Sequence, residues 1–379
     1  MNYAKVLDDI FKQFNGPKFG VRFWDNETKF YGNGQDTEFT LCISKPKVVK
    51  RLLSEGALGF GESYMDKTLD IEGDIGAYLK LRHQFKHVKP SMRLVVAKIW
   101  AELTKPMDRG GQISYHYDLG NDFFSLFLDK ETMSYSAAHY ETAQDTLAQA
   151  QLNKFGLICD WMNLPKGSSV LDLGSGWGGF AIHAVQNHGW TIDGKTLSQK
   201  QLDYCKVLVE KNKLSDQIII NYDDFTSIKE GVVYDGAVMI EAIEHVGKDN
   251  LGDFLSHISQ KLHTGAPFYL QFTGRYQPKL VDPWTLKYVF PGGHLPSKQE
   301  FLDAARCAGL EVEIFEDHTE DYKKTMSSWI DSMEGHEIKI KEMFDEKFFR
   351  LWKLWTHGAR VNFEIRDMSL FRVLLRKLQ

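Results

Sequence analysis

The chain has 379 residues, of which 43% are hydrophobic, and its formal net charge is −5 at pH 7. This size suffices for two domains, and the acidic balance argues against a nucleic-acid-binding protein. The four cysteines form no C-x-x-C pair, so we expect neither a metal site nor a disulfide framework. The chain lacks an apolar run of about 18 residues and does not begin like a signal peptide. We therefore expect a cytoplasmic protein whose membrane contacts are peripheral.

The first 80 or so residues alternate short strand-like segments with turns. Residues 21–24 and 39–43 are the clearest strand candidates. Residues 47–53 have helical spacing, and Pro46 stands where a first helical residue would be. These features predict a small α+β domain at the N-terminus.

A basic stretch follows, from Lys80 to Arg109, in which lysines and arginines alternate with apolar residues. Such a segment can lie on an anionic membrane surface. A solvated linker helix packed against a domain has the same composition, and this alternative stays open. The residues from Pro106 to Gly111 are typical of a boundary. We therefore expect an N-terminal domain over residues 1–108, suited to lipid binding or dimerisation, and a second domain over 109–379.

From about Asn153, apolar segments alternate with helical ones. This βαβ pattern predicts an α/β fold with a doubly wound, Rossmann-like sheet that binds ligands at the carboxyl ends of its strands. The last 40 or so residues are expected to form packed helices. The predicted strands cover residues 169–173, 190–193, 217–221, 236–240 and 267–273.

The run V-L-D-L-G-S-G-W-G-G reads as a strand that enters a cofactor-binding loop. Gly174, Gly176 and Gly179 match the dinucleotide pattern G-x-G-x-x-G, and Asp193 lies where a ribose-binding acid would stand, which indicates NAD. Asp172 favours S-adenosylmethionine instead, because a carboxylate there would repel a pyrophosphate. S-adenosylmethionine carries no phosphate, and its sulfonium and ammonium groups attract negative charge. We favour S-adenosylmethionine and keep NAD as the alternative.

Further blocks surround this loop in a fixed order. Together with it they resemble the cyclopropane-fatty-acyl-phospholipid synthase family, which includes the mycolic acid cyclopropane synthases. The resemblance covers about residues 110–379 and extends loosely to L-G-F-G-E-S-Y-M-D at 58–66, a run typical of the phospholipid-acting members. The blocks are Y-D-L-G-N-D-F-F at 117–124, Y-S-A-A at 135–138, T-L-S-Q-K-Q at 196–201, E-H-V-G at 244–247 and F-P-G-G-H-L-P-S at 290–297.

The resemblance implies a class I S-adenosylmethionine-dependent methyltransferase domain and a defined reaction. An enzyme of this family transfers a methylene from S-adenosylmethionine to the cis double bond of an unsaturated phospholipid acyl chain. The reaction passes through a carbocation, and a bound bicarbonate ion removes the proton. The substrate implies an enzyme at the inner face of the membrane, and a homodimer is possible. The alternatives are a lipid C-methyltransferase with a methyl-branched or methylene product, and a catalytically impaired lipid-binding homologue.

Carried over by position, the resemblance also implies the site residues. Tyr117 would lie close to the reacting centre, and Glu244, Tyr322, Gln271 and Ala137 would surround bicarbonate. The residues implied to bind the cofactor are Tyr135, Ser136, Asp172, Gly174, Gly176, Thr196, Leu197, Gln201 and Tyr222.

Two positions depart from the family pattern, and Glu241 also stands out. Ala137 replaces a cysteine but keeps the backbone N–H that can hold the ion. Gln271 replaces a histidine, and it can donate a hydrogen bond but cannot carry charge or relay a proton. Glu241 stands where some members have a small residue, and a second carboxylate works against an anionic bicarbonate. Glu241 could itself serve as the base.

Overall fold

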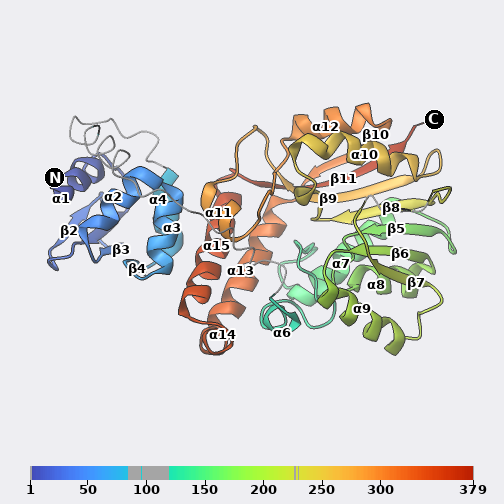
Figure 1. Cartoon of the computed structure of the whole chain (residues 1–379), viewed down its shortest axis with the longest axis horizontal. Helices are drawn as coiled ribbons and strands as arrows, with labels where there is room; N and C mark the ends of the chain where they lie inside the picture. Colours follow the sequence, from blue (N-terminus) through green and yellow to red (C-terminus); the bar gives the residue numbers. More distant parts are fainter. Residues whose placement is uncertain (1, 84–94, 96–118, 226–227, 229, 379) are drawn as a thin grey trace. The chain divides into compact units, whose positions relative to one another are not determined.

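The computed structural model describes residues 2–83, 95, 119–225, 228 and 230–378 (Figure 1). Two compact units divide the chain. The first takes residues 1–114, 282–291 and 334–361, and the second takes 115–281, 292–333 and 362–379. The expected boundary after residue 108 and most of the basic stretch from Lys80 to Arg109 lie outside the described residues. Both therefore stay predictions. Two segments of the C-terminal half, residues 282–291 and 334–361, belong to the first unit.

The first unit contains a four-stranded sheet in the order β2-β1-β3-β4. Both strands expected from the sequence are present, although the first begins and ends earlier than predicted. The predicted helix is confirmed as α2, and Pro46 opens it. The strands are β1 (Lys18–Arg22), β2 (Thr28–Tyr31), β3 (Thr37–Ile43) and β4 (Leu69–Gly73), and the helices are α1 (Tyr3–Phe11), α2 (Pro46–Glu55), α3 (Ala57–Met65), α4 (Ile75–Arg82), α11 (Pro283–Tyr288), α14 (Glu337–Met343) and most of α15 (Glu346–Glu364).

The run at 58–66 has a packing role within this unit. A Cβ atom on Gly61 would lie 2.2 Å from the ring of Trp284, so only glycine lets α11 approach α3 this closely. The next residue, Glu62, accepts hydrogen bonds from Lys287 Nζ at 3.0 Å and from Tyr288 Oη at 2.7 Å. These contacts tie the segment 282–291 to the N-terminal residues.

The second unit is built on a seven-stranded sheet in the order β10-β11-β9-β8-β5-β6-β7. β11 runs antiparallel to both of its neighbours, β9 and β10, and the other described pairs in this sheet are parallel. The Rossmann-like prediction is confirmed, and the five predicted strands agree with β5–β9 to within a few residues. The strands are β5 (Ser169–Leu173), β6 (Thr191–Thr196), β7 (Ile218–Tyr222), β8 (Gly236–Ile240), β9 (Pro267–Gly274), β10 (Leu310–Asp317) and β11 (Ser369–Lys377).

The expectation of helices at the C-terminus is half wrong. Residues 346–364 do form a helix, but residues 369–377 form β11, which lies between β9 and β10. This strand is buried over most of its length, so its apolar residues are continuous rather than alternating. A short continuous apolar run cannot be assigned to a strand or a helix from its periodicity alone.

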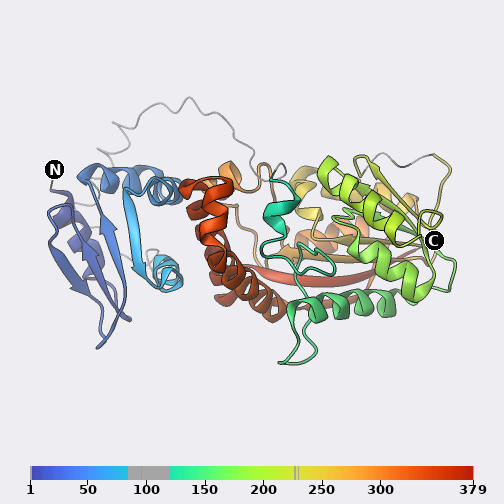
Figure 2. The ribbon, with the colours of Figure 1, turned by 90° about the horizontal axis from the view of Figure 1, so that it is seen from below.

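Helices cover both faces of this sheet and give three layers (Figures 1 and 2). On one face α7, α8 and α9 pack on apolar residues of β5, β6 and β7, and on the other α10 and α12 pack on β8, β9 and β11. Hydroxyl N-caps fix where these helices begin, for example Thr146 before α7 and Ser198 before α9. The helices are α6 (Asn121–Phe124), α7 (Leu147–Met162), α8 (Gly179–His188), α9 (Gln199–Lys211), α10 (Leu251–Gln260), α12 (Lys298–Cys307) and α13 (Thr319–Gly335), with 3₁₀ turns η2 (Ile243–His245) and η3 (Lys248–Asn250).

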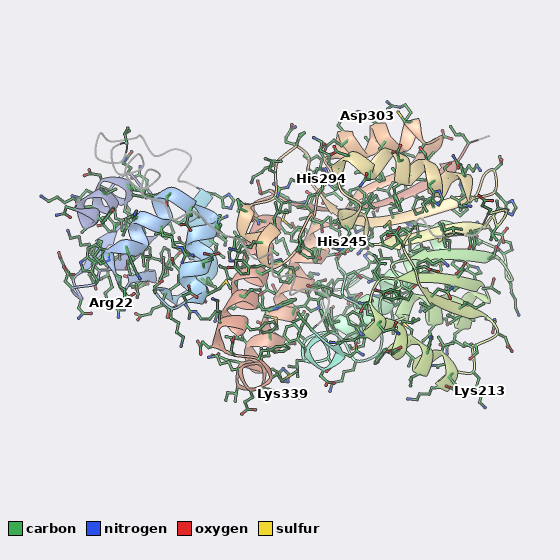
Figure 3. All side chains as sticks on the ribbon, in the orientation of Figure 1. Arg22, Lys213, His245, His294, Asp303 and Lys339 are labelled. Atoms are coloured by element: carbon green, nitrogen blue, oxygen red, sulfur yellow. The ribbon has the colours of Figure 1, made fainter. Side chains whose placement is uncertain are left out.

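The order of the strands determines where a ligand can bind. From β5 the sheet extends to β6 on one side and to β8 on the other, so the connections leave β5 and β8 in opposite directions. The carboxyl ends of these two strands therefore border a crevice, which is the usual ligand site of such sheets. Figure 3 labels His245 in η2, which follows β8 at this edge. No described helix is long and apolar enough to cross a bilayer.

Candidate active site

The loop after β5 has a backbone that only glycine adopts without strain. Gly174 and Gly176 have φ values of +91° and +54°. A Cβ atom on Gly176 would meet no other atom within 4 Å, so open space lies beside the loop. A ligand can therefore approach the backbone here.

Asp172 lies at the base of this loop with an unsatisfied carboxylate. The residue is 2% exposed, and its Oδ2 atom has no hydrogen-bond partner among the described residues. Burial raises the pKa of Asp172 to about 7. A buried carboxylate without a partner is unfavourable, and a ligand cation would relieve that cost. S-adenosylmethionine, a cation without phosphate, fits this loop.

The competing NAD interpretation depended on Asp193. This residue lies within β6 rather than at its carboxyl end, where a ribose would bind. Its carboxylate accepts a hydrogen bond from the hydroxyl of Tyr234 and pairs with Lys195 Nζ at 3.1 Å. Asp193 is therefore engaged in structure, and the interpretation as an NAD site is wrong.

A pocket adjoins the glycine loop, and two residues predicted to bind the cofactor, Tyr135 and Gln201, line it. Gln201 Oε1 accepts a hydrogen bond from Thr196 Oγ1 at 2.9 Å, which links the end of β6 to α9. Leu197 and Tyr222 follow at the ends of β6 and β7, and both are about half exposed, at 53% and 54%. Exposed apolar and aromatic surfaces at this edge suit a planar base. The pocket is lined by Gly120, Asn121, Phe124, Tyr135, Trp177, Ser198, Lys200 and Gln201.

Ser136 has a different environment from the other predicted cofactor residues. It is buried, and its hydroxyl accepts a hydrogen bond from Lys154 Nζ at 2.7 Å. Lys154 is fully buried in α7 and also donates to Gln151 Oε1 at 2.6 Å. Burial lowers the pKa of Lys154 to about 7. The predicted cofactor role of Ser136 stays a prediction.

A second cluster centres on Glu241, directly after β8. Its Oε1 atom accepts hydrogen bonds from the backbone N–H of Ala137 and from Gln271 Nε2, both at 2.7 Å. Its Oε2 atom accepts one from Tyr322 Oη at 2.6 Å. Ala137, Gln271 and Tyr322 are three of the four residues that the sequence assigned to bicarbonate. The structure brings all three together, but around the carboxylate of Glu241.

Glu244, the fourth of those residues, lies beside this cluster. Its Oε1 atom accepts a hydrogen bond from the backbone N–H of Thr273 at 2.6 Å, whereas Oε2 has no partner among the described residues. Burial, with the nearby charge of Glu241, raises the pKa of Glu244 to about 8. Glu244 is therefore mostly protonated at neutral pH.

Arg372, on β11, supports the cluster from behind. Its side chain is fully buried and donates from Nε to Gln271 Oε1 at 2.9 Å and from Nη1 to Asp321 Oδ2 at 3.1 Å. His139, His318 and Asp321 have the spacing of metal ligands. Arg372 Nη1 lies within 3.1 Å of all three, so a guanidinium already fills that position.

Sequence analysis missed Lys154 and Arg372, although each left a signal. Lys154 shares the buried face of α7 with Phe155 and Ile158, and Arg372 interrupts an apolar strand. A charged residue at an apolar position is rarely buried unless it is paired. Tyr117, predicted near the reacting centre, lies outside the described residues.

Known protein families and relatives match this chain over most of its length. The family model described as mycolic acid cyclopropane synthetase matches residues 104–373, and a domain family of unknown function matches residues 6–87. Cyclopropane-fatty-acyl-phospholipid synthase of Escherichia coli K12 is 31% identical over 340 residues, which cover 88% of this chain and 86% of that protein. A probable fatty acid methyltransferase of Pseudomonas putida is 29% identical over 378 residues, covering 93% and 90%.

A solved structure has the same fold as the second unit. The crystal structure of mycolic acid cyclopropane synthase CmaA1, complexed with SAH and CTAB, superposes with a TM-score of 0.66 at 26% identity and covers 70% of this chain and 97% of that one. The family model covers well over half of the residues. The chain therefore belongs to the mycolic acid cyclopropane synthetase family and is an S-adenosylmethionine-dependent methyltransferase.

Proposed function

We propose that this enzyme transfers the methyl carbon of S-adenosylmethionine to the cis double bond of an unsaturated phospholipid acyl chain and closes a cyclopropane ring. The observation that carries the proposal is the juxtaposition of a cation-binding loop after β5 with a buried carboxylate cluster after β8. Lipid substrates are named for the relatives from Escherichia coli and Pseudomonas putida. The proposal extends that substrate class to this chain.

S-adenosylmethionine supplies an electrophilic methyl group on a positively charged sulfur. Asp172 would hold a cationic group of this molecule, and Gly176 leaves room for it beside the backbone. Tyr222 and Leu197 would flank its adenine, and Thr196 and Gln201 would contact the cofactor at the end of β6. These assignments are part of the proposal.

The lipid double bond is a weak nucleophile, so the reaction leaves positive charge on the acyl chain. The π electrons form the new carbon–carbon bond as the methyl–sulfur bond breaks, and a carbocation remains on the second alkene carbon. One proton then leaves the transferred methyl group, and the C–H electron pair closes the ring. Water would trap such a cation, so the site must exclude it.

Aromatic side chains beside the carboxylate cluster suit a cationic intermediate. Tyr322 stacks on Phe363 with ring centres 4.3 Å apart, and Tyr135 stacks on Trp329 with ring centres 5.2 Å apart. Ring faces stabilise positive charge, most strongly where water is absent. This environment favours transfer to carbon through a cation over transfer to a hydroxyl or an amine.

The test is mass analysis of phospholipids incubated with the enzyme and methyl-labelled donor. The proposal predicts a labelled gain of one CH₂ unit in unsaturated acyl chains, which resists mild hydrogenation because the double bond has become a ring. Absence of label from the lipid fraction would contradict the proposal. Saturated phospholipid of the same headgroup is the control and should take up no label.

A lipid C-methyltransferase is the second candidate, and Glu241 is the observation that favours it. A base held by the protein chain can remove a proton from a neighbouring acyl carbon instead of from the new methyl group. The product would then be a methyl-branched alkene, and a methylene forms instead if a hydride shifts to the cationic carbon before the new methyl group loses its proton. Both products gain one CH₂ unit, as the ring does, but they keep a double bond to which mild hydrogenation adds two hydrogens. That single reaction separates these products from the ring.

We also propose that the enzyme works at the inner face of the membrane as a homodimer. The acyl chains of its substrate lie in a bilayer, and the segment from Lys80 to Arg109 combines basic and apolar residues. Co-sedimentation with anionic vesicles should fall as salt rises, and sedimentation velocity should give twice the chain mass. Failure to bind vesicles at low salt, or a monomer, would overturn the respective part.

A further inference from the structure

The two positions that depart from the family pattern meet Glu241 at one point in the structure. Ala137 lies in the segment between α6 and α7, Glu241 directly follows β8, and Gln271 lies in β9. The backbone N–H of Ala137 and the amide of Gln271 both donate to the same oxygen of Glu241. The three positions therefore form one hydrogen-bonded group.

The carboxylate of Glu241 takes the hydrogen bonds that a bicarbonate ion would need. Within the described part of the chain, two donors reach Oε1 and the hydroxyl of Tyr322 reaches Oε2, which leaves a lone pair of Oε2 able to take a proton. Glu244 accepts a hydrogen bond from the backbone N–H of Thr273 and offers at most one donor, when it is protonated. Among the described residues, the groups expected to hold bicarbonate thus already hold a carboxylate of the chain, and the site does not fit the ion.

Charge gives a second argument against a bound anion. A bicarbonate ion would place a second negative charge beside the buried carboxylate of Glu241, and the two charges would repel each other in a medium of low dielectric constant. The positive charge nearby comes from two buried residues. Lys154 attracts Glu241, and Arg372 reaches it through Gln271. Since Arg372 is already paired with Asp321, the charge of Lys154 balances the carboxylate that the chain provides.

We infer that Glu241 is the general base of the reaction and replaces bicarbonate. The inference rests on the proposed function. Glu241 takes a proton from the transferred methyl group and becomes a carboxylic acid, while the C–H electron pair forms the last bond of the ring. After the products leave, the acid returns its proton to water. No oxidant, metal or added ion takes part in this step.

The condition of the carboxylate agrees with such a role. Burial raises the pKa of Glu241, although Tyr322, Ala137, Gln271 and Lys154 oppose the rise. A raised pKa makes a carboxylate a stronger base near neutral pH. Glu241 accepts three hydrogen bonds and Glu244 accepts one, so the donors favour the negative charge of the pair on Glu241.

The backbone of Glu241 is strained, so the surrounding structure must hold the residue in this conformation. Its φ is +50°, in the left-handed region that glutamate rarely adopts. Strain of this kind persists where the surrounding structure enforces it, and it clusters at functional sites. Glycine would adopt this φ freely and would empty the space between Ala137, Gln271 and Tyr322.

Two variants and one depletion test the inference. Activity of the wild-type enzyme should not change when dissolved bicarbonate and carbon dioxide are removed. Glu241→Gln should lose at least about 100-fold in product formation, the usual contribution of a general base, while its affinity for S-adenosylmethionine stays within about threefold. Glu241→Gly should be equally impaired, and added bicarbonate should restore part of its activity, because the ion can then use the released donors.

The outcomes separate the inference from the proposed function. Loss of wild-type activity on bicarbonate depletion, or full activity of Glu241→Gln, would overturn the inference alone. A wild-type enzyme that labels no lipid under any condition would overturn the proposed function and the inference with it. Circular dichroism and binding of S-adenosylmethionine establish that each variant is folded, and the depletion arm needs no variant at all.

Discussion

Arg372 donates from Nε to Oε1 of Gln271 at 2.9 Å, and this bond determines which end of the Gln271 amide faces Glu241. A guanidinium can only donate, so the oxygen of the amide must point to Arg372 and its nitrogen to Glu241. The carboxylate thereby gains a donor where the family usually has a histidine. Arg372 acts through Gln271 and is a positioning residue.

Arg372→Met should destabilise the protein strongly. The substitution leaves the buried carboxylate of Asp321 without its guanidinium partner, and such losses cost about 3–5 kcal/mol. Arg376→Met is a matched control on the same strand, because Arg376 pairs with Glu313 at a partly exposed site. That change should cost less than about 1 kcal/mol. Urea unfolding of the two variants measures both, and equal losses would contradict the buried role of Arg372.

Asp172 should make the binding of S-adenosylmethionine depend on pH. The pKa of Asp172 is raised to about 7 by burial, so the free enzyme loses this negative charge as the pH falls through 7. Affinity for the cationic donor should therefore weaken from pH 8 to pH 6, as measured by calorimetry. Asp172→Asn should weaken binding by about 10-fold or more at pH 8 and should abolish the dependence.

Asp193→Asn is the control for this prediction. Asp193 lies on the adjacent strand and pairs with Lys195 and Tyr234, away from the carboxyl end of β6. Its substitution should leave the affinity and its pH dependence nearly unchanged. A larger loss with Asp193→Asn than with Asp172→Asn would contradict the assignment of the cation site.

Alanine substitutions at two glycines of positive φ should separate an effect on cofactor binding from the cost of backbone strain. Gly176 in the cofactor loop and Gly167 before β5 have φ values of +54° and +88°, and an added Cβ atom meets nothing within 4 Å at either position. Alanine at either site should therefore cost about 1–2 kcal/mol of stability through backbone strain alone. Only Gly176→Ala places a methyl group beside the ligand, so only it should weaken S-adenosylmethionine binding. Thermal unfolding and calorimetry on both variants check this, and equal affinities would refute it.

Glu244 should make the folded state less stable as pH rises. Its pKa is raised from 4.5 to about 8 in the folded protein, so the native state binds more protons than the unfolded chain between these values. Its contribution to the free energy of unfolding is complete below pH 4.5 and is lost as the pH rises towards 8. Over this range the free energy of unfolding falls by up to about 1.4 kcal/mol per pH unit.

Glu244→Gln removes this titration and leaves the other groups in place. The difference in unfolding free energy between wild type and variant should therefore shift in favour of the variant from pH 5.5 to pH 8.5. Urea denaturation at several pH values measures it. A constant difference across this range would show that Glu244 has an ordinary pKa.

The sequence predicted the parts of the molecule that local patterns encode. The strand 169–173 and its glycine loop were identified to the residue, because an apolar run, an acid and glycines follow one another directly. Asp172 was identified as the decisive residue for the same reason. The role of Arg372 could not be predicted, since it depends on the pairing of β11 with β9, in which Arg372 lies opposite Gln271. Glu241 was noticed as unusual, but only the tertiary structure shows which donors it takes.

The position of β11 also bears on how the chain reaches its native state. Ser369 pairs with Gly274, so the inner edge of β9 must wait for a partner that is synthesised long after it. Until then a buried, apolar strand has an open edge, which invites pairing with other chains. Such late, non-local pairing slows folding and lengthens the exposure. The guanidinium that positions Gln271 arrives with the same strand, so catalytic competence and protection from aggregation are acquired in one step.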